Sequence, residues 1–253
     1  QNVCDWFKAN RLQINAGKTK YMIFQSSKVK LSHSDMSIYM DDKAISRVTS
    51  FSFLGVIIDD RLSWKNHVNH IHGKISVAIG MMYKLRAILP KKTLFMLYNA
   101  LVLPYFDYCS LIWSGALETD LNRLVILQKK AIRLCTNSHY LAHTPPLFKE
   151  LATLSLRDRI AFKTGLFMYK YVNSLLPNIF NDYFITHFMK HNLNTRNKQN
   201  FVLPFCRLKV RQLNSIQYKG VKIWNSLDCD LKCLNSLNLF KSKHKRQLLN
   251  TYL

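Results

Sequence analysis

The stretch FLGVIIDDRLSWKNH, residues 53–67, decides how the chain divides. Its first half is a short apolar run with one glycine, which is typical of a buried strand. Asp59 and Asp60 then predict a solvated polar turn rather than a metal site. Ser63 is a candidate helix N-cap, and a basic amphipathic helix is predicted from His67. We therefore expect a small β unit to end here and a long helical region to follow.

Upstream of this stretch, the pattern predicts one short helix and several short strands. Val3 and Phe7 fall on one helix face, and residues 18–24 predict a turn that enters a strand. Residues 37–39 and 45–52 predict further short strands that pair with each other. We expect an α plus β-meander unit that ends near Asp60.

Downstream, the hydrophobic period becomes helical. Apolar residues recur at steps of three and four from Val68 to Leu89, and Pro90 ends the run. Asp120 is the expected N-cap of a later helix. Thr144-Pro145-Pro146 predicts a break between two helical segments. The remaining expected elements are helices at 91–103, 121–134, 156–174, 220–226 and 237–249, a linker at 191–200 and a strand-like segment at 201–210.

These elements predict a mainly α fold of the α+β class. We expect residues 1–62 to form a small α plus β unit, 63–143 a helical bundle, and 144–253 a basic helical extension. From Lys190 onward there are 13 Lys plus Arg and two acidic residues, Asp228 and Asp230. No internal repeat of solenoid length is evident.

The charge balance points to a polyanionic partner. The 253 residues include 37 Lys plus Arg against 14 Asp plus Glu, a formal net charge of +23, and the pI is near 9.9. Such an excess repels itself unless it meets a polyanion, so nucleic acid is the leading partner class. An anionic membrane surface is the weaker alternative.

The sequence predicts no membrane span and an intracellular protein. The most apolar region, residues 94–113, is interrupted by Asn99, Pro104 and Asp107, and a span needs about 18 uninterrupted apolar residues. No signal peptide is visible. Because the sequence begins with Gln1 rather than Met, we expect it to be part of a longer gene product.

The cysteines favour reduced thiols over a disulfide framework, because they are few and form no C-x-x-C pair. Cys229 and Cys233 are one helical turn apart and His244 follows, but zinc sites use more numerous and closer ligands. The six are Cys4, Cys109, Cys135, Cys206, Cys229 and Cys233.

The tetrapeptide Tyr39-Met40-Asp41-Asp42 matches the Y-x-D-D of reverse transcriptases, whose aspartates hold Mg²⁺ in a β-hairpin turn. That motif needs apolar strands on both sides, and residues 43–47 (KAISR) make a poor strand. Among the acidic residues upstream, Asp5 lies on a predicted helix. On these grounds we expect an exposed acidic turn without a metal.

Two segments on either side of that tetrapeptide resemble the reverse transcriptases of non-LTR (LINE-type, jockey-like) retrotransposons. WFKANRLQINAGKT, residues 6–19, is similar to W-F-x-x-N-x-L-x-L-N-x-x-K-T, motif D of the polymerase palm. Residues 53–68 resemble F-L-G-x-x-I-D-x-x-L-x-W-x-x-H-I, the primer grip that leads into the thumb. In this family the catalytic aspartates precede motif D, so the resemblance puts them before Gln1.

Later segments extend the resemblance over nearly the whole chain. LPYFDY at 103–108 with Trp113, and LQKKAIR at 127–133, are similar to I-x-P-x-x-x-Y…W and L-Q-x-x-x-x-R of the same family. Residues 224–227 (WNSL) and 240–241 (FK) resemble its C-terminal W-N-x-L-P and F-K. Asp228 departs from this pattern, because the family has proline there.

The resemblance implies a palm remnant, a thumb-like helical bundle and a C-terminal extension of an RNA-directed DNA polymerase. The implied partners are an RNA template and a DNA primer, bound without sequence preference, and the implied location is the nucleus. No cofactor is expected in this chain, although the complete enzyme would use Mg²⁺. The residues implied to touch nucleic acid are Lys18, Phe53, Leu54, Gly55, Lys65, His67, Lys74, Lys84, Lys129, Lys130 and Arg133.

Three hypotheses remain open from the sequence. The chain is a fragment of a mobile-element reverse transcriptase that cannot polymerise alone, a non-enzymatic nucleic-acid-binding module, or a degenerate remnant without a selected function. The basic helices fit the first two equally, since phosphate contacts need only positive charge.

Overall fold

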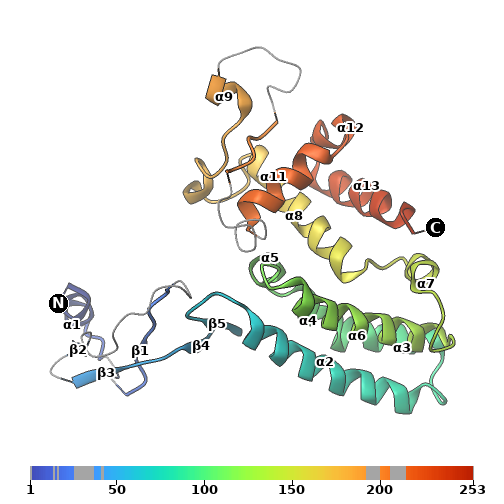
Figure 1. Cartoon of the computed structure of the whole chain (residues 1–253), viewed down its shortest axis with the longest axis horizontal. Coiled ribbons are helices and arrows are strands. Elements are labelled where there is room, and N and C mark those ends of the chain that lie inside the picture. Colours follow the sequence, from blue (N-terminus) through green and yellow to red (C-terminus); the bar gives the residue numbers. More distant parts are fainter. Residues whose placement is uncertain are drawn as a thin grey trace. The chain divides into compact units, whose positions relative to one another are not determined.

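The computed structural model describes residues 2–13, 15, 17–25, 37–40, 43–191, 200–205 and 215–252. These residues form a mainly helical α+β structure with small sheets near the N-terminus, as predicted (Figure 1). The chain forms two compact units, Gln1–His67 and Val68–Leu253. The boundary falls just inside helix α2 (Lys65–Leu85).

The first unit holds helix α1 (Asn2–Ala9) and two small sheets. One sheet has the strand order β1-β3-β2, in which β1 (Lys20–Tyr21) is parallel to β3 (Lys43–Arg47) and β2 (Ile38–Met40) is antiparallel to it. The other is the hairpin of β4 (Ser50–Phe53) and β5 (Val56–Asp59). The predicted pairing of residues 37–39 with the following strand is found in β2 and β3. The strands do not form one continuous meander, because β1 is parallel to β3 and β4 and β5 form a separate hairpin.

The segment judged a poor strand, residues 43–47, is strand β3. It pairs on both edges, with Ile38 opposite Ile45 on one side and Lys20 opposite Ser46 on the other. Its one buried side chain is Ile45. Backbone pairing on two edges, rather than strand propensity, therefore holds this segment extended.

The second unit continues α2 and adds a succession of helices. The predicted N-cap Asp120 is wrong, because its helix begins two residues earlier, after Leu117. Pro145 and Pro146 lie in the first turn of a helix, where proline is tolerated. The helices are α3 (Lys91–Leu101), α4 (Leu103–Asp107), α5 (Ser110–Trp113), α6 (Glu118–Thr136), α7 (Thr144–Glu150), α8 (Leu156–Val172), η1 (Asn178–Phe180), α9 (His187–His191), α11 (Ile216–Ser226), α12 (Cys229–Lys232) and α13 (Leu237–Asn250).

Some expected segments lie partly or wholly outside the described residues. Of the expected linker at 191–200, residues 192–199 are outside the description. Of the strand-like 201–210, residues 201–205 are described, and Phe201 forms an isolated antiparallel bridge with Thr186. Among the residues described, no helix is long and apolar enough to cross a membrane.

A fully buried glutamine joins three parts of the second unit. The Gln128 Nε2 of α6 donates to the Tyr98 hydroxyl of α3 at 2.9 Å and to the Leu154 carbonyl at 3.0 Å. Its Oε1 accepts the Leu156 N–H, at the start of α8, at 2.6 Å. Burial raises the pKa of Tyr98 to about 12, so this hydroxyl stays protonated at neutral pH. One side chain thereby fixes α3, α6 and α8 together.

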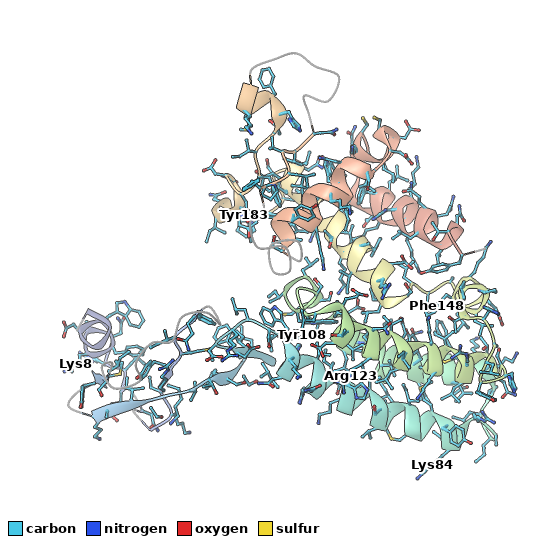
Figure 2. All side chains as sticks on the ribbon, in the orientation of Figure 1. Lys8, Lys84, Tyr108, Arg123, Phe148 and Tyr183 are labelled. Carbon is cyan, nitrogen blue, oxygen red and sulfur yellow. The ribbon has the colours of Figure 1, made fainter. Side chains whose placement is uncertain are left out.

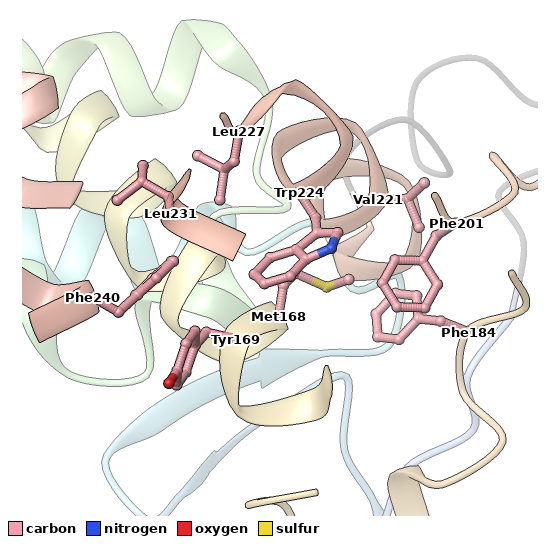
Figure 3. Close-up of a cluster of buried hydrophobic side chains, with 9 residues drawn as sticks. All are labelled: Met168, Tyr169, Phe184, Phe201, Val221, Trp224, Leu227, Leu231 and Phe240. Carbon is pink, nitrogen blue, oxygen red and sulfur yellow. The ribbon is translucent and has the colours of Figure 1, made fainter. Parts of the chain in front are cut away.

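A second core lies around α8, α11 and α13. Figure 3 shows its nine side chains, which come from α8, from the bridge segments and from the last three helices. Asn225 reinforces it, because its side chain accepts the Phe201 N–H at 3.1 Å and donates to the Phe201 carbonyl at 2.8 Å. The buried residues are Met168, Tyr169, Phe184, Phe201, Val221, Trp224, Leu227, Leu231 and Phe240.

Helix α8 also approaches α13 closely through a glycine. A Cβ at Gly165 would lie 2.7 Å from Nε2 of His244, so a larger residue there would force the His244 ring to move. The His244 ring is buried and lies 5.6 Å from the ring of Phe162 and 5.4 Å from that of Phe240, measured between centroids. Burial lowers the pKa of His244, against smaller opposing effects of the Ala161 backbone and the Gln247 side chain.

Replacing Gln128 by leucine should lower the free energy of unfolding by about 3 kcal/mol or more. The change leaves the buried Leu156 N–H and Leu154 carbonyl without a partner, at about 1–3 kcal/mol each, and removes the bond to Tyr98. Urea unfolding followed by circular dichroism measures the loss. Gln217→Leu, at an exposed position on α11, is the matched control and should change stability by about 0.5 kcal/mol at most. Equal losses of the free energy of unfolding in the two variants would contradict the role assigned to Gln128.

The second unit should lose stability as the pH falls below about 6.5, the ordinary pKa of histidine. His244 takes up a proton less readily when folded than when unfolded, so acid favours the unfolded chain. Urea midpoints at pH 7.5 and pH 5.0 measure the effect in the wild type and in His244→Leu. The variant should show the smaller difference between the two pH values, and an unchanged difference would contradict this assignment.

Candidate nucleic-acid interface

Helix α6 presents a basic stripe to solvent opposite its buried face. Its inner side carries the core leucines and Gln128, and these positions repeat with the helical period. The outer, solvent-facing side therefore carries the charged residues, which are costly to bury. We call Arg123, Lys129, Lys130 and Arg133 the α6 basic stripe; the first three are exposed and Arg133 is half-buried.

One edge of the α6 basic stripe faces helix α2. Arg123 donates to Oδ1 of Asn69 at 2.7 Å, which ties the two helices together (Figure 2). Burial lowers the pKa of His72, and the positive charges of Arg123 and Lys130 lower it further. Arg123 and Lys130 thus place positive charge beside His72, and an anion would be stabilised there.

The other edge of the stripe faces the loop before α7. Arg133 Nε donates to the Ala142 carbonyl at 2.9 Å, which holds the guanidinium in place. Lys129 lies one helical turn before Arg133 and is exposed. The structure thus places Lys129, Lys130 and Arg133 on one face of α6 together with Arg123.

The α2 cations do not join this edge. Lys74 is exposed and comes two positions after His72, so it lies about 200° around the helix from His72. Lys84 is also exposed and lies in the last turn of α2 (Figure 2). They form separate positive points on α2 within the second unit.

In the first unit, the predicted primer-grip residues form a strained hairpin tip. Phe53 pairs with Val56, so Leu54 and Gly55 make a two-residue turn. Both have positive φ, 47° and 79°, which fits the type I′ turns of tight hairpins. Positive φ is costly for leucine, yet Leu54 is 74% exposed and Phe53 58% exposed. The tip thus holds two large apolar side chains in water.

Asp59 anchors the chain between this hairpin and α2. Its carboxylate accepts N–H bonds from Arg61 at 3.1 Å, from Ser63 at 2.9 Å and from Trp64 at 2.9 Å. Ser63 Oγ in turn accepts the N–H of Lys65, the first residue of α2. The expectation of a solvated turn is therefore wrong for Asp59, which is buried because backbone donors replace its water.

The other residues of the first unit that are predicted to contact nucleic acid differ in their exposure to solvent. Lys18 and Lys65 are exposed. His67 is buried, and its Nδ1 accepts the Ile57 N–H at 3.3 Å, so it braces strand β5 rather than facing solvent. We therefore leave His67 out of the proposed surface.

The acidic tetrapeptide is only partly described. Tyr39 and Met40 belong to β2, with Met40 opposite Lys43, whereas Asp41 and Asp42 lie outside the described residues. Within the part of the chain that the structure describes, no three His, Cys, Asp or Glu side chains are grouped to hold a metal. Cys229 and Cys233 are exposed and His244 is buried, so these three do not form a zinc site.

Comparison with known proteins identifies relatives. The probable RNA-directed DNA polymerase from transposon X-element of Drosophila melanogaster is 22% identical over 159 residues, 62% of this chain. The RNA-directed DNA polymerase from mobile element jockey of Drosophila funebris is 23% identical over 159 residues, also 62% of the chain. The probable RNA-directed DNA polymerase from transposon BS of Drosophila melanogaster is 25% identical over 166 residues, 63% of the chain.

The chain is a distant relative of these jockey-like non-LTR retrotransposon polymerases. The matched region spans only 17–18% of the length of these polymerases. It covers less of this chain than the nearly complete resemblance expected from the motifs. No family model and no solved structure matches the chain.

Several residues of the segments that carry the resemblance have structural roles. Gln128 of the L-Q segment joins three helices, and Trp224 and Phe240 of the C-terminal segments lie in the second core. Sequence reasoning missed this role of Gln128, although a glutamine on the apolar side of a helix signals a buried hydrogen-bond network. It also missed the pairing of Arg123 with Asn69, which only the packing of α6 on α2 creates.

Proposed function

We propose that this chain is a template-primer-binding part of an RNA-directed DNA polymerase from a jockey-like non-LTR retroelement. The observation that carries the proposal is the α6 basic stripe on a rigid helix of a distant relative of such polymerases. The net charge of +23 supports it, because phosphate neutralisation supplies sequence-independent binding.

In this proposal, the second unit holds the duplex through its backbone. The edge formed by Arg123 and Lys130 lies against phosphates of the duplex, and Lys74 and Lys84 contact nucleic acid at separate points of α2. Among the described residues, none of these four Lys and Arg side chains forms an ion pair with a carboxylate. Such contacts position a duplex without reading its sequence.

The first unit contributes the contacts nearest the chemistry. We assign the exposed hairpin tip of Phe53, Leu54 and Gly55 to the primer end, because exposed apolar side chains on a strained turn mark a binding surface. Lys18 is assigned to the phosphates of the incoming nucleotide and Lys65 to the duplex backbone. These two roles rest on the resemblance to motif D and to the primer grip.

The chain by itself is proposed to bind without polymerising. Polymerase chemistry needs two metal ions held by carboxylates, and we assign those carboxylates to a segment that precedes motif D, as the resemblance implies. In the complete polymerase they would hold Mg²⁺, and the activity would take place in the nucleus. Primer extension by the purified chain with Mg²⁺ would contradict this.

A non-enzymatic nucleic-acid-binding module is the second candidate, and the same basic stripe supports it. The two candidates differ when the remaining polymerase domains of a jockey-like element are supplied as a separate polypeptide. A polymerase part should restore primer extension there, whereas a free-standing module should only compete for duplex.

Removing two charges from the stripe should weaken duplex binding in a salt-dependent way. In Arg123→Gln/Lys130→Gln, the negative slope of log K against log salt should shrink in magnitude by about 0.9 for each lost phosphate contact. Fluorescence anisotropy with a labelled RNA–DNA duplex measures the slope between about 50 and 200 mM salt, a range over which phosphate contacts change the affinity strongly.

The matched control is Lys243→Gln/Arg246→Gln, which removes the same two charges from exposed positions on α13. It should leave the slope unchanged. If both double variants lose affinity equally, the binding reflects total charge rather than the α6 basic stripe, and the proposed interface is wrong.

A further inference from the structure

A hollow of about 560 Å³ opens between α6, the loop before α7, the start of α8 and the C-terminal Tyr252. It lies within the second unit, on the edge of the α6 basic stripe that faces away from α2. Its size falls within the 300–1,000 Å³ range of pockets that hold small ligands. A lone phosphate would leave most of this volume empty.

The charged side chains among the described residues that line the hollow are all basic. Lys129 and Arg133 line it from α6, Arg157 lines it from α8, and His143 lines it from the loop. No Asp or Glu is among its described lining residues. Arg157 does pair with Glu118, but both side chains are mostly exposed, so this pair is easily exchanged for another anion. Three positive charges around one hollow favour an anionic ligand.

The floor of the hollow is apolar and held rigidly. Phe148 of α7 (Figure 2) and Tyr252 are buried, with ring centroids 5.9 Å apart. The Tyr252 hydroxyl accepts the Ser155 N–H at 2.8 Å and also bonds to the Asp158 carboxylate. Arg133 is fixed by the Ala142 carbonyl on the opposite side. The hollow is therefore preformed, with cations at its rim and an apolar interior.

An exposed aromatic ring lies on the residue that directly precedes the loop segment lining the hollow, Leu141 to His143. Tyr140 is 73% exposed, and the His139 ring packs on it at 4.5 Å between centroids. The next residue, Leu141, is also exposed and lines the hollow. Proteins that bind single strands combine a basic groove with aromatic side chains on which bases stack.

We propose that this hollow, with Tyr140 at its rim, binds an unpaired strand of RNA. Lys129, Arg133 and Arg157 contact the phosphates, one base enters the apolar interior, and a neighbouring base stacks on Tyr140. The inference rests on the proposed function in making the ligand nucleic acid. It uses a different edge of α6 from the duplex-binding pair Arg123 and Lys130, so the two can fail separately.

The test measures the affinity of the full chain for a labelled oligouridylate of about ten nucleotides, within the usual single-strand site sizes. Lys129→Gln/Arg157→Gln should weaken binding about tenfold, as two close phosphate contacts are lost. Lys243→Gln/Arg246→Gln on α13 is the matched control and should bind as the wild type does. Equal affinities of the two double variants would overturn the proposal.

The aromatic contact has its own pair of variants. Tyr140→Ala should weaken oligouridylate binding about tenfold, the usual effect of losing one stacked base. Phe205→Ala removes a similarly exposed ring elsewhere in the second unit and should have no effect. If Tyr140→Ala binds as tightly as Phe205→Ala, the rim assignment is wrong.

A measurement on the unmodified chain avoids any effect of the substitutions on folding. Acetylation of lysines is followed by mass spectrometry with and without saturating oligouridylate. Lys129 should be protected severalfold, whereas Lys243 should react at the same rate in both samples. Unchanged reactivity of Lys129 would overturn the proposal even if the RNA–DNA duplex still binds at Arg123 and Lys130. Equal protection by free uridine monophosphate would show a mononucleotide site and overturn the strand assignment.

Discussion

The buried amide of Gln128 is the interaction on which the second unit depends most. Its three hydrogen bonds reach a hydroxyl of α3, the carbonyl of Leu154 and the first N–H of α8. Each of these groups is shielded from water, so the bonds cannot be exchanged for solvent without a free-energy cost. The relative placement of three helices therefore follows from one side chain whose donors and acceptor are all used.

This constraint has a consequence on the outer face of the same helix. Because α6 cannot rotate without breaking the Gln128 bonds, the α6 basic stripe points in a fixed direction. One edge is tied to α2 through Arg123 and Asn69, and the other is tied to the loop through Arg133 and Ala142. Positive charge held on a rigid element loses little conformational entropy when it meets phosphate. The hydrogen bonds of the buried Gln128 amide thus also fix the direction in which the surface cations point.

Sequence patterns predicted the helices of the second unit well, because their apolar faces repeat over many turns. They failed where distant parts of the chain decide the outcome. Residues 43–47 become a strand only because two other strands pair with them. Asp59 and His67 are buried because backbone N–H groups of the following turn and of β5 satisfy them. The cations of α6 were found from sequence, but the arrival of Arg157 beside Lys129 depends on the fold.

The most direct test of the account is the pKa of His72, measured by NMR in the free chain and in complex with an RNA–DNA duplex. In the free chain, burial and the charges of Arg123 and Lys130 hold this pKa below its ordinary value of about 6.5. Phosphates placed along that edge would offset the positive field, so the account predicts a clear rise on binding. An unchanged pKa in a sample where the duplex is fully bound would contradict the proposed interface.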